Sequence, residues 1–79
     1  MFIVIEIQVN DNNEVSTIVT NYATRNEADN QYHTILAYAA ISAVKVHTAM
    51  IVTADGQLVA SDRYIHIQEQ PVEEEQEEQ

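Results

Sequence analysis

One group of side chains in this sequence combines bases, an acid and a hydroxyl. Its members lie near the C-terminal end, on both sides of a turn: Lys45, His47, Asp62, Tyr64 and His66. Two imidazoles and a carboxylate can share a divalent metal ion or position a proton transfer. Their spacing matches no diagnostic metal motif, however, and a solvated face of an antiparallel sheet has the same composition. We therefore favour a solvated face and keep four residues as a candidate ligand face: Lys45, His47, Tyr64 and His66.

A β-hairpin over residues 45–67 would position this cluster. Asp55-Gly56 is a strong two-residue turn signal, and β-rich segments flank it. Such a turn pairs Ala54 with Gln57, and counting back predicts three further pairs: Met50 with Ser61, His47 with Tyr64, and Val46 with Ile65. The cluster then lies opposite an apolar face that a helix could cover: Val46, Met50, Val52, Val59, Ile65 and Ile67.

A first hairpin is predicted over residues 2–22. Residues 2–9 alternate with the period of a half-buried strand, and the β-branched segment "VSTIVTNY" follows at residues 15–22. With Asn12 and Asn13 as the turn, Ile7 pairs with Ile18 and Ile3 with Tyr22. The expected core face of the first strand consists of Ile3, Ile5, Ile7 and Val9.

The segment between the hairpins predicts a helix over residues 25–43. Thr24 is a candidate N-cap, and Glu27 completes a capping box that satisfies two backbone donors. The face expected on the sheet is Ala28, Tyr32, Ile35, Leu36, Ala39 and Ala43. A second stripe on the opposite side is interpreted as an assembly interface: Thr34, Ala37, Tyr38 and Ile41. The alternative is that these are ordinary scattered apolar residues at a surface.

The elements together predict an α+β fold. We expect a four-stranded, mainly antiparallel sheet in β-β-α-β-β order, with one helix packed on one face. Residues 1–68 form the single domain, and residues 69–79 form a disordered acidic tail that contributes six glutamates. The strand order stays open at this point, because the crossover permits more than one arrangement.

Composition excludes several function classes. The net charge is −10 and the chain has three basic residues, so direct nucleic-acid binding is not expected. There is no cysteine for a thiolate metal site, and a single glycine leaves no P-loop or dinucleotide fingerprint. No apolar run approaches a membrane span, so we expect a cytoplasmic protein without membrane contact. No catalytic, metal or cofactor-binding residue is predicted, and His33 has no partner at metal-pair spacing.

The sequence resembles small proteins encoded by phages, prophages and gut Firmicutes. The segments "YATRNEADNQYHTILAYAA" and "DGQLVASDRYIH" carry the resemblance, which covers residues 2–66. Its helix residues are an acid, an aromatic-His pair and Leu-Ala repeats: Glu27, Tyr32, His33, Leu36, Ala37, Ala39 and Ala40. The resemblance implies a setting rather than an activity, namely accessory or counter-defence factors that bind a host component and block or sequester it.

The leading hypothesis is a non-enzymatic, homo-oligomeric binding protein whose partner is a host protein or a small molecule. One alternative is a sponge for a small anionic (cyclic) nucleotide, in which an oligomer gathers Arg25, Lys45 or Arg63 around phosphates. Another is a nucleic-acid mimic that acts through the acidic tail. A metal-dependent enzyme ranks last.

Overall fold

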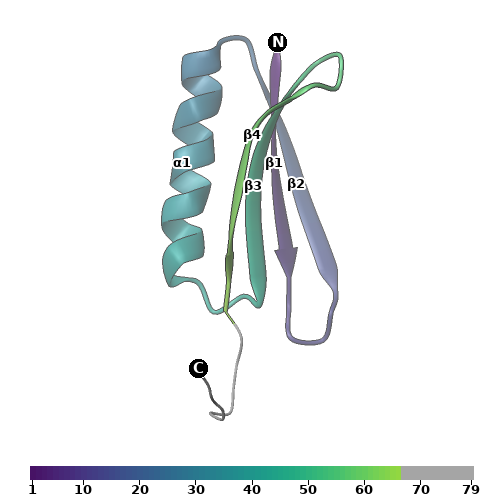
Figure 1. Cartoon of the computed structure of the whole chain (residues 1–79), viewed down its shortest axis with the longest axis vertical. Coiled ribbons are helices and arrows are strands. Elements are labelled where there is room, and N and C mark those ends of the chain that lie inside the picture. The colour runs from purple at the N-terminus through teal and green to yellow at the C-terminus, as the bar shows by residue number, and fades with distance from the viewer. Residues whose placement is uncertain (67–79) are drawn as a thin grey trace, which may run out of the picture.

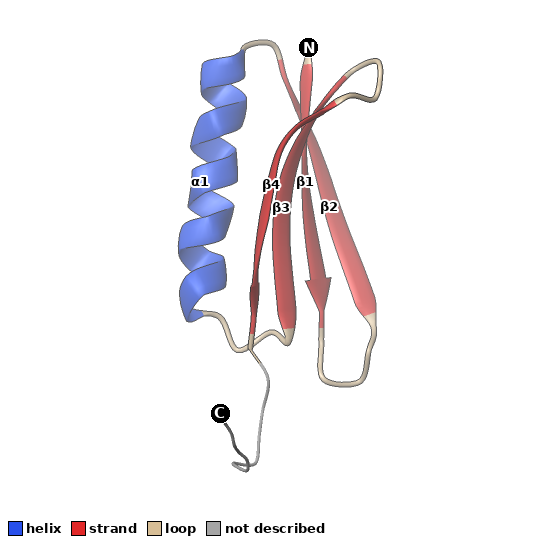
Figure 2. Ribbon diagram, in the orientation of Figure 1, coloured by secondary structure: helices blue, strands red, loops and turns tan. Residues whose placement is uncertain are grey.

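The chain folds as a four-stranded sheet with a helix on one face (Figure 1, Figure 2). The structure, a computed structural model, describes residues 1–66. In chain order the elements are β1 (Phe2–Val9), β2 (Val15–Tyr22), α1 (Arg25–Ile41), β3 (Val46–Thr53) and β4 (Leu58–Ile65). The strands are antiparallel and lie in the order β2-β1-β3-β4. The predicted α+β class, element order and covering helix are therefore confirmed.

The strand order puts β1 and β3 in the centre of the sheet and β2 and β4 at its edges. Both β2 and β3 run antiparallel to β1, so they are parallel to each other and α1 is the crossover between them. Crossovers of this kind are almost always right-handed, which restricts the helix to one face of the sheet.

The last residues lie outside this description. Residues 67–79 include Ile67, the end of the expected domain at residue 68, and the acidic segment of residues 69–79. Among residues 1–66, no helix is long and apolar enough to cross a membrane.

Both hairpins turn through three residues instead of the predicted two. In the first, the Asn13 N–H donates to the Asn10 carbonyl (2.9 Å) and the Asn10 N–H donates to the Glu14 carbonyl (3.0 Å). The second repeats this pattern, with the Gly56 N–H donating to the Thr53 carbonyl (2.9 Å). The third turn residue is left-handed in each case, with φ 63° at Asn13 and 92° at Gly56. Asparagine and glycine are the residues that adopt this conformation at least cost.

The additional turn residue affects the two registers differently. In the first hairpin it moves the register by one, so Ile7 pairs with Thr17 and not with Ile18. In the second hairpin a β-bulge opposite Ile51 and Val52 compensates for it. Three predicted pairs of that hairpin are therefore confirmed: Val46 with Ile65, His47 with Tyr64, and Met50 with Ser61.

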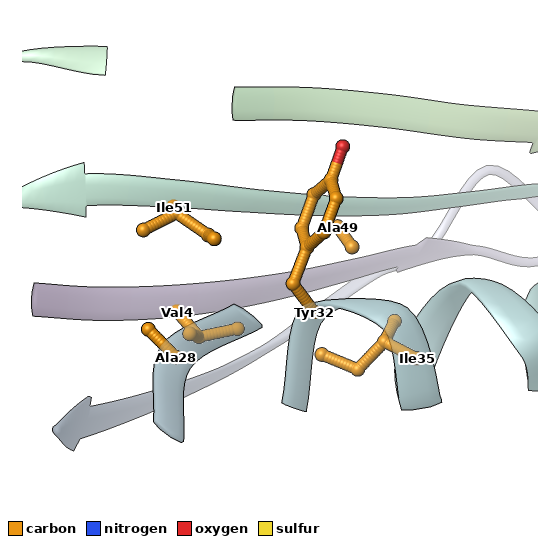
Figure 3. Close-up of a cluster of buried hydrophobic side chains, with 6 residues drawn as sticks. All are labelled: Val4, Ala28, Tyr32, Ile35, Ala49 and Ile51. Carbon is orange, nitrogen blue, oxygen red and sulfur yellow. The ribbon is translucent and has the colours of Figure 1, made fainter. Parts of the chain in front are cut away.

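The helix covers the sheet face opposite to the expected one. Val4 of β1 and its partner Ile51 of β3 are fully buried beneath α1. Figure 3 shows the Tyr32 ring in the same layer as Ala49, whose small side chain leaves room for it. The prediction chose the more apolar face, but α1 packs on the face that provides small side chains at the helix contact. The buried cluster is Val4, Ala28, Tyr32, Ile35, Ala49 and Ile51.

The helix begins as predicted and ends two residues early. The Thr24 hydroxyl accepts a hydrogen bond from the Glu27 N–H (3.2 Å), which confirms the N-cap. The Glu27 carboxylate accepts from the Thr24 hydroxyl (3.2 Å) rather than from its backbone N–H, so the capping box satisfies one backbone donor instead of two. Ser42 caps the C-terminus, and Ala43 is exposed beyond it rather than packed on the sheet.

Candidate functional site

The sheet face that α1 leaves uncovered is rich in apolar side chains. We call it the outer face. On this side of the sheet, Ile3 of β1 pairs with Val52 of β3, and Ile5 pairs with Met50. Ile5 also pairs with Val19, which extends the outer face onto β2. The apolar members of the outer face are Ile3, Ile5, Ile7, Val9, Val15, Val19, Val46, Met50, Val52, Leu58 and Ile65.

Charge is nearly absent from the outer face. Within residues 1–66, Arg63 is the one charged residue that the register places there, paired with Thr48. Several members are widely exposed, with Val15 at 64% and Val19 at 61%. Soluble monomers rarely expose a contiguous apolar patch larger than a few hundred Å². A face with this composition is typical of a contact surface.

A buried polar pair lies on the other side of the sheet, beneath α1. His47 is 3% exposed, and its Nε2–H donates to the Glu6 Oε2 at 2.6 Å. The Gln8 amide donates to the same carboxylate oxygen at 2.9 Å. The sequence prediction placed His47 on the solvated face, and this was wrong. Because the Glu6 carboxylate accepts from one ring nitrogen of His47, the sheet can turn both side chains toward the helix.

The second ring nitrogen of His47 has no hydrogen-bond partner within the described residues. A glutamate that holds one imidazole nitrogen and leaves the other free resembles the orienting pair of a general base. In this chain the free Nδ1 is enclosed. No group of three or more His, Asp or Glu side chains in the described part of the chain is placed to hold a metal ion. The pair fits a structural role at the buried interface of α1 with the sheet.

Removing one member of this pair should destabilise the fold, and removing both should cost less. We expect Glu6→Leu to lower the free energy of unfolding by about 1–3 kcal/mol, because it leaves the buried His47 without its acceptor. Glu6→Leu combined with His47→Leu should recover most of that loss, since apolar pairs often replace buried polar pairs without penalty. Urea denaturation measures the free energy of unfolding of the single and double variants. If the double variant lost the sum of the two single losses, the pair would not be coupled.

The other members of the expected ligand face have separate partners. Lys45 Nζ donates to Asn13 Oδ1 (2.7 Å) in the first turn. His66 Nε2 donates to the Ala39 carbonyl (2.7 Å) near the end of α1, and its ring stacks on Tyr64 with centroids 6.3 Å apart. The register puts His47 and Tyr64 on the helix side of the sheet, not opposite the core as expected. They do not converge on one ligand position.

Tyr32 links the core to the edge strand β4. Burial of its side chain raises the pKa of the hydroxyl above the ordinary value of 10.0, and the Asp62 carboxylate raises it further. Folding therefore disfavours ionisation of the Tyr32 hydroxyl.

The tyrosine predicts an alkaline limit to stability. Because the folded-state pKa lies above the unfolded value of about 10, the stabilisation is complete below that pH and is lost as pH rises through the folded pKa. Denaturation midpoints from pH 8 to pH 11 should fall less steeply for Tyr32→Phe than for the wild type. Tyr38→Phe, at an exposed position, should follow the wild type. Equal slopes for all three proteins would contradict this role of Tyr32.

The second helix stripe lies at the surface, as its spacing predicted. Tyr38 is 64% exposed and Ile41 is 84% exposed, on the side of α1 away from the sheet. Thr34 and Ala37 are also exposed, and the Thr34 hydroxyl donates to the Asn30 carbonyl at 2.8 Å. The stripe is much smaller than the outer face, whose β1 and β3 members the sequence prediction had placed beneath the helix.

The basic residues do not gather within one chain. Arg25 pairs with Asp29 (2.8 Å) at the start of α1, where both side chains are partly exposed. Lys45 immediately precedes β3. The start of β3 and the start of α1 lie at opposite ends of the sheet (Figure 1). Arg63 lines a shallow open hollow along β4, together with Thr48, Ser61, Asp62, Tyr64 and Ile65. A common phosphate site would require several copies of the chain.

Comparison of the chain with models of protein families, with curated proteins and with solved structures finds no match.

Proposed function

We propose that this chain is a non-enzymatic binding protein that acts as a homo-oligomer, and that the outer face joins two copies. The observation that supports this is the apolar, almost uncharged outer face, which no described element covers. In a two-fold dimer the same surface of both copies is in contact. The apolar outer face of one copy would therefore meet the equally apolar outer face of the other.

The area of the outer face suits a dimer. Strands about 4.8 Å apart, with about 3.4 Å per residue, give four eight-residue strands a projected area on the order of 500 Å². Accessible area exceeds projected area, so two opposed faces bury on the order of 1,200 Å², the lower end of stable interfaces. At about 25 cal/mol per Å² of apolar surface, this burial favours association by many kcal/mol before its entropic cost.

Charge also favours a second copy over a charged partner. The chain carries −10 in total, yet the outer face holds only Arg63 within the described residues. Opposed outer faces therefore bury almost no charge, and the acidic groups stay in water. Because the two copies repel each other at long range, the dimer should tighten as salt screens that repulsion. A partner that depends on charge attraction would show the reverse.

The chain's small core gives a reason for assembly. Among residues 1–66, the fully buried apolar residues are few and several are alanines: Val4, Ala28, Ala39, Ala49 and Ile51. Domains of this size have a slim margin of stability, which association increases.

Opposed sheets would leave α1 outward on both copies, so each dimer would present two stripes of Tyr38 and Ile41. The resemblance to phage-encoded accessory proteins supports a role for these stripes in blocking or sequestering a host component.

Native mass spectrometry of gently purified protein tests this proposal, since it reports subunit number and any retained molecule together. We expect an even number of chains whose assembly strengthens from low to moderate salt. Tyr38→Asp with Ile41→Asp should keep the dimer while losing any partner bound at the helices. A monomer at micromolar concentration and at every salt concentration would overturn the proposal.

A further inference from the structure

The free edge of β2 lacks the features that usually prevent strand pairing. β2 pairs with β1 on one side, and its eight pairs run without a register break. Residues 15–22 contain no charged residue and no proline. Val15, Ile18 and Val19 are each more than half exposed. Native sheets protect a free edge with charges, prolines or bulges, because an unprotected edge recruits another strand.

The other edge of the sheet has those protections. β4 carries the bulge opposite Ile51 and Val52, and two adjacent charges, Asp62 and Arg63. The Asp62 carboxylate also accepts a hydrogen bond from the Arg63 backbone N–H at 2.8 Å. That amide is then unavailable to a neighbouring strand. Of the two edge strands, β2 alone lacks these protections against pairing.

The first turn defines which β2 amides face the free edge. The Asn10 N–H donates to the Glu14 carbonyl, so residues 10 and 14 form a hydrogen-bonded pair. Such pairs alternate along an antiparallel ladder, which directs the even-numbered β2 amides to β1. The amides that point away from β1 are those of Val15, Thr17, Val19 and Asn21.

We propose that β2 pairs, antiparallel, with β2 of a second copy and so joins two sheets into one. Self-pairing of this segment opposes no like charges, and it places β-branched residues across from each other, a favourable arrangement. When Ile18 or Val19 lies on the two-fold axis, both helices lie on the same side and the outer face continues from one copy to the next. This contact is carried by the β2 edge and does not depend on pairing of the outer faces.

Amide hydrogen exchange followed by NMR tests this contact on the whole chain. With β2 paired, the amides of Val15, Thr17, Val19 and Asn21 should exchange at least about 100-fold more slowly than outward amides of β4, such as Ser61 and Ile65. If the outward amides of β2 exchange as fast as those of β4, the proposal is wrong. The same measurement on Ile5→Asp, which carries a charge on the outer face, separates the two contacts. Slow β2 amides in that variant would show that the edge pairs without the faces.

Cysteine cross-linking gives a second test, because the chain has no cysteine of its own. Ile18→Cys lies on the helix side of β2, beyond the reach of opposed outer faces. Under mild oxidation it should cross-link to itself, or to Thr20→Cys in a mixture when Val19 is on the axis, at least tenfold faster than Tyr64→Cys, which lies on the helix side of β4. Equal or faster cross-linking of Tyr64→Cys would contradict pairing through β2.

Discussion

Ile5→Asp should abolish the outer-face contact and reduce the mass of the assembled protein, leaving folded chains that are joined by the β2 edge alone. Ile5 lies in the middle of the outer face, between Val19 and Met50, and makes no part of the cluster beneath α1. A buried charge without a partner costs about 3–5 kcal/mol, and a two-fold interface contains the change twice, so association should weaken at least about a hundredfold. Sedimentation equilibrium measures the mass, and circular dichroism reports whether the chain remains folded.

The control places negative charge elsewhere, on α1. Tyr38→Asp with Ile41→Asp changes exposed residues of α1 and should leave outer-face association intact. If the chain is too unstable without the outer-face contact, Ile5→Asp will unfold at a lower temperature than the wild type, and added osmolyte should restore folded protein. An Ile5→Asp protein with the wild-type mass would exclude the outer face as the contact.

Ile51→Ala should destabilise the protein by about 2–5 kcal/mol at every protein concentration. Ile51 is one of the two largest fully buried side chains, and truncation leaves a cavity between α1 and the sheet. Its neighbour Val52 belongs to the outer face. Val52→Ala should have a smaller effect whose size depends on protein concentration, because it weakens association rather than the core. Urea denaturation at two concentrations that differ tenfold distinguishes the two losses.

A milder substitution keeps this test informative if Ile51→Ala does not fold. Ile51→Val should cost about 0.5–1.5 kcal/mol, again without concentration dependence. The sequence prediction reverses these expectations, because it placed Val52, and not Ile51, on the face that the helix covers. A larger loss for Val52→Ala than for Ile51→Ala in dilute protein would therefore favour the original assignment of faces.

Local signals in the sequence predicted the elements correctly. Thr24 marks the helix start because its hydroxyl can accept from Glu27, a contact within one turn of chain. Asp55-Gly56 marks the second hairpin because glycine adopts the left-handed conformation observed at φ 92°. Alternation correctly predicted which residues of β1 share a face. Each of these properties depends on residues a few positions apart.

The covered face could not be predicted from such local signals. It depends on turn length, strand order and crossover handedness together, and one additional residue in the first turn changes which side chains of β1 and β2 lie together. The comparison of apolar content was also misleading. Assembly can require the more apolar face on the outside, and Glu6 with His47 made the less apolar face suitable for burial. The sequence therefore revealed the apolar face of the strands but not which face of the sheet the helix covers.

The most direct test of the proposed assembly uses the two methionines of the chain. Met50 lies on the outer face and Met1 is 63% exposed at the N-terminus. Protein labelled with ¹³C in its methionine methyl groups is mixed, after unfolding and refolding, with an equal amount of unlabelled protein, and isotope-filtered cross-relaxation is recorded. We predict intermolecular signals from the Met50 methyl to isoleucine and valine methyls of an unlabelled copy. A Met50 methyl with intramolecular signals alone, in a sample whose mass is that of one chain, would contradict outer-face pairing.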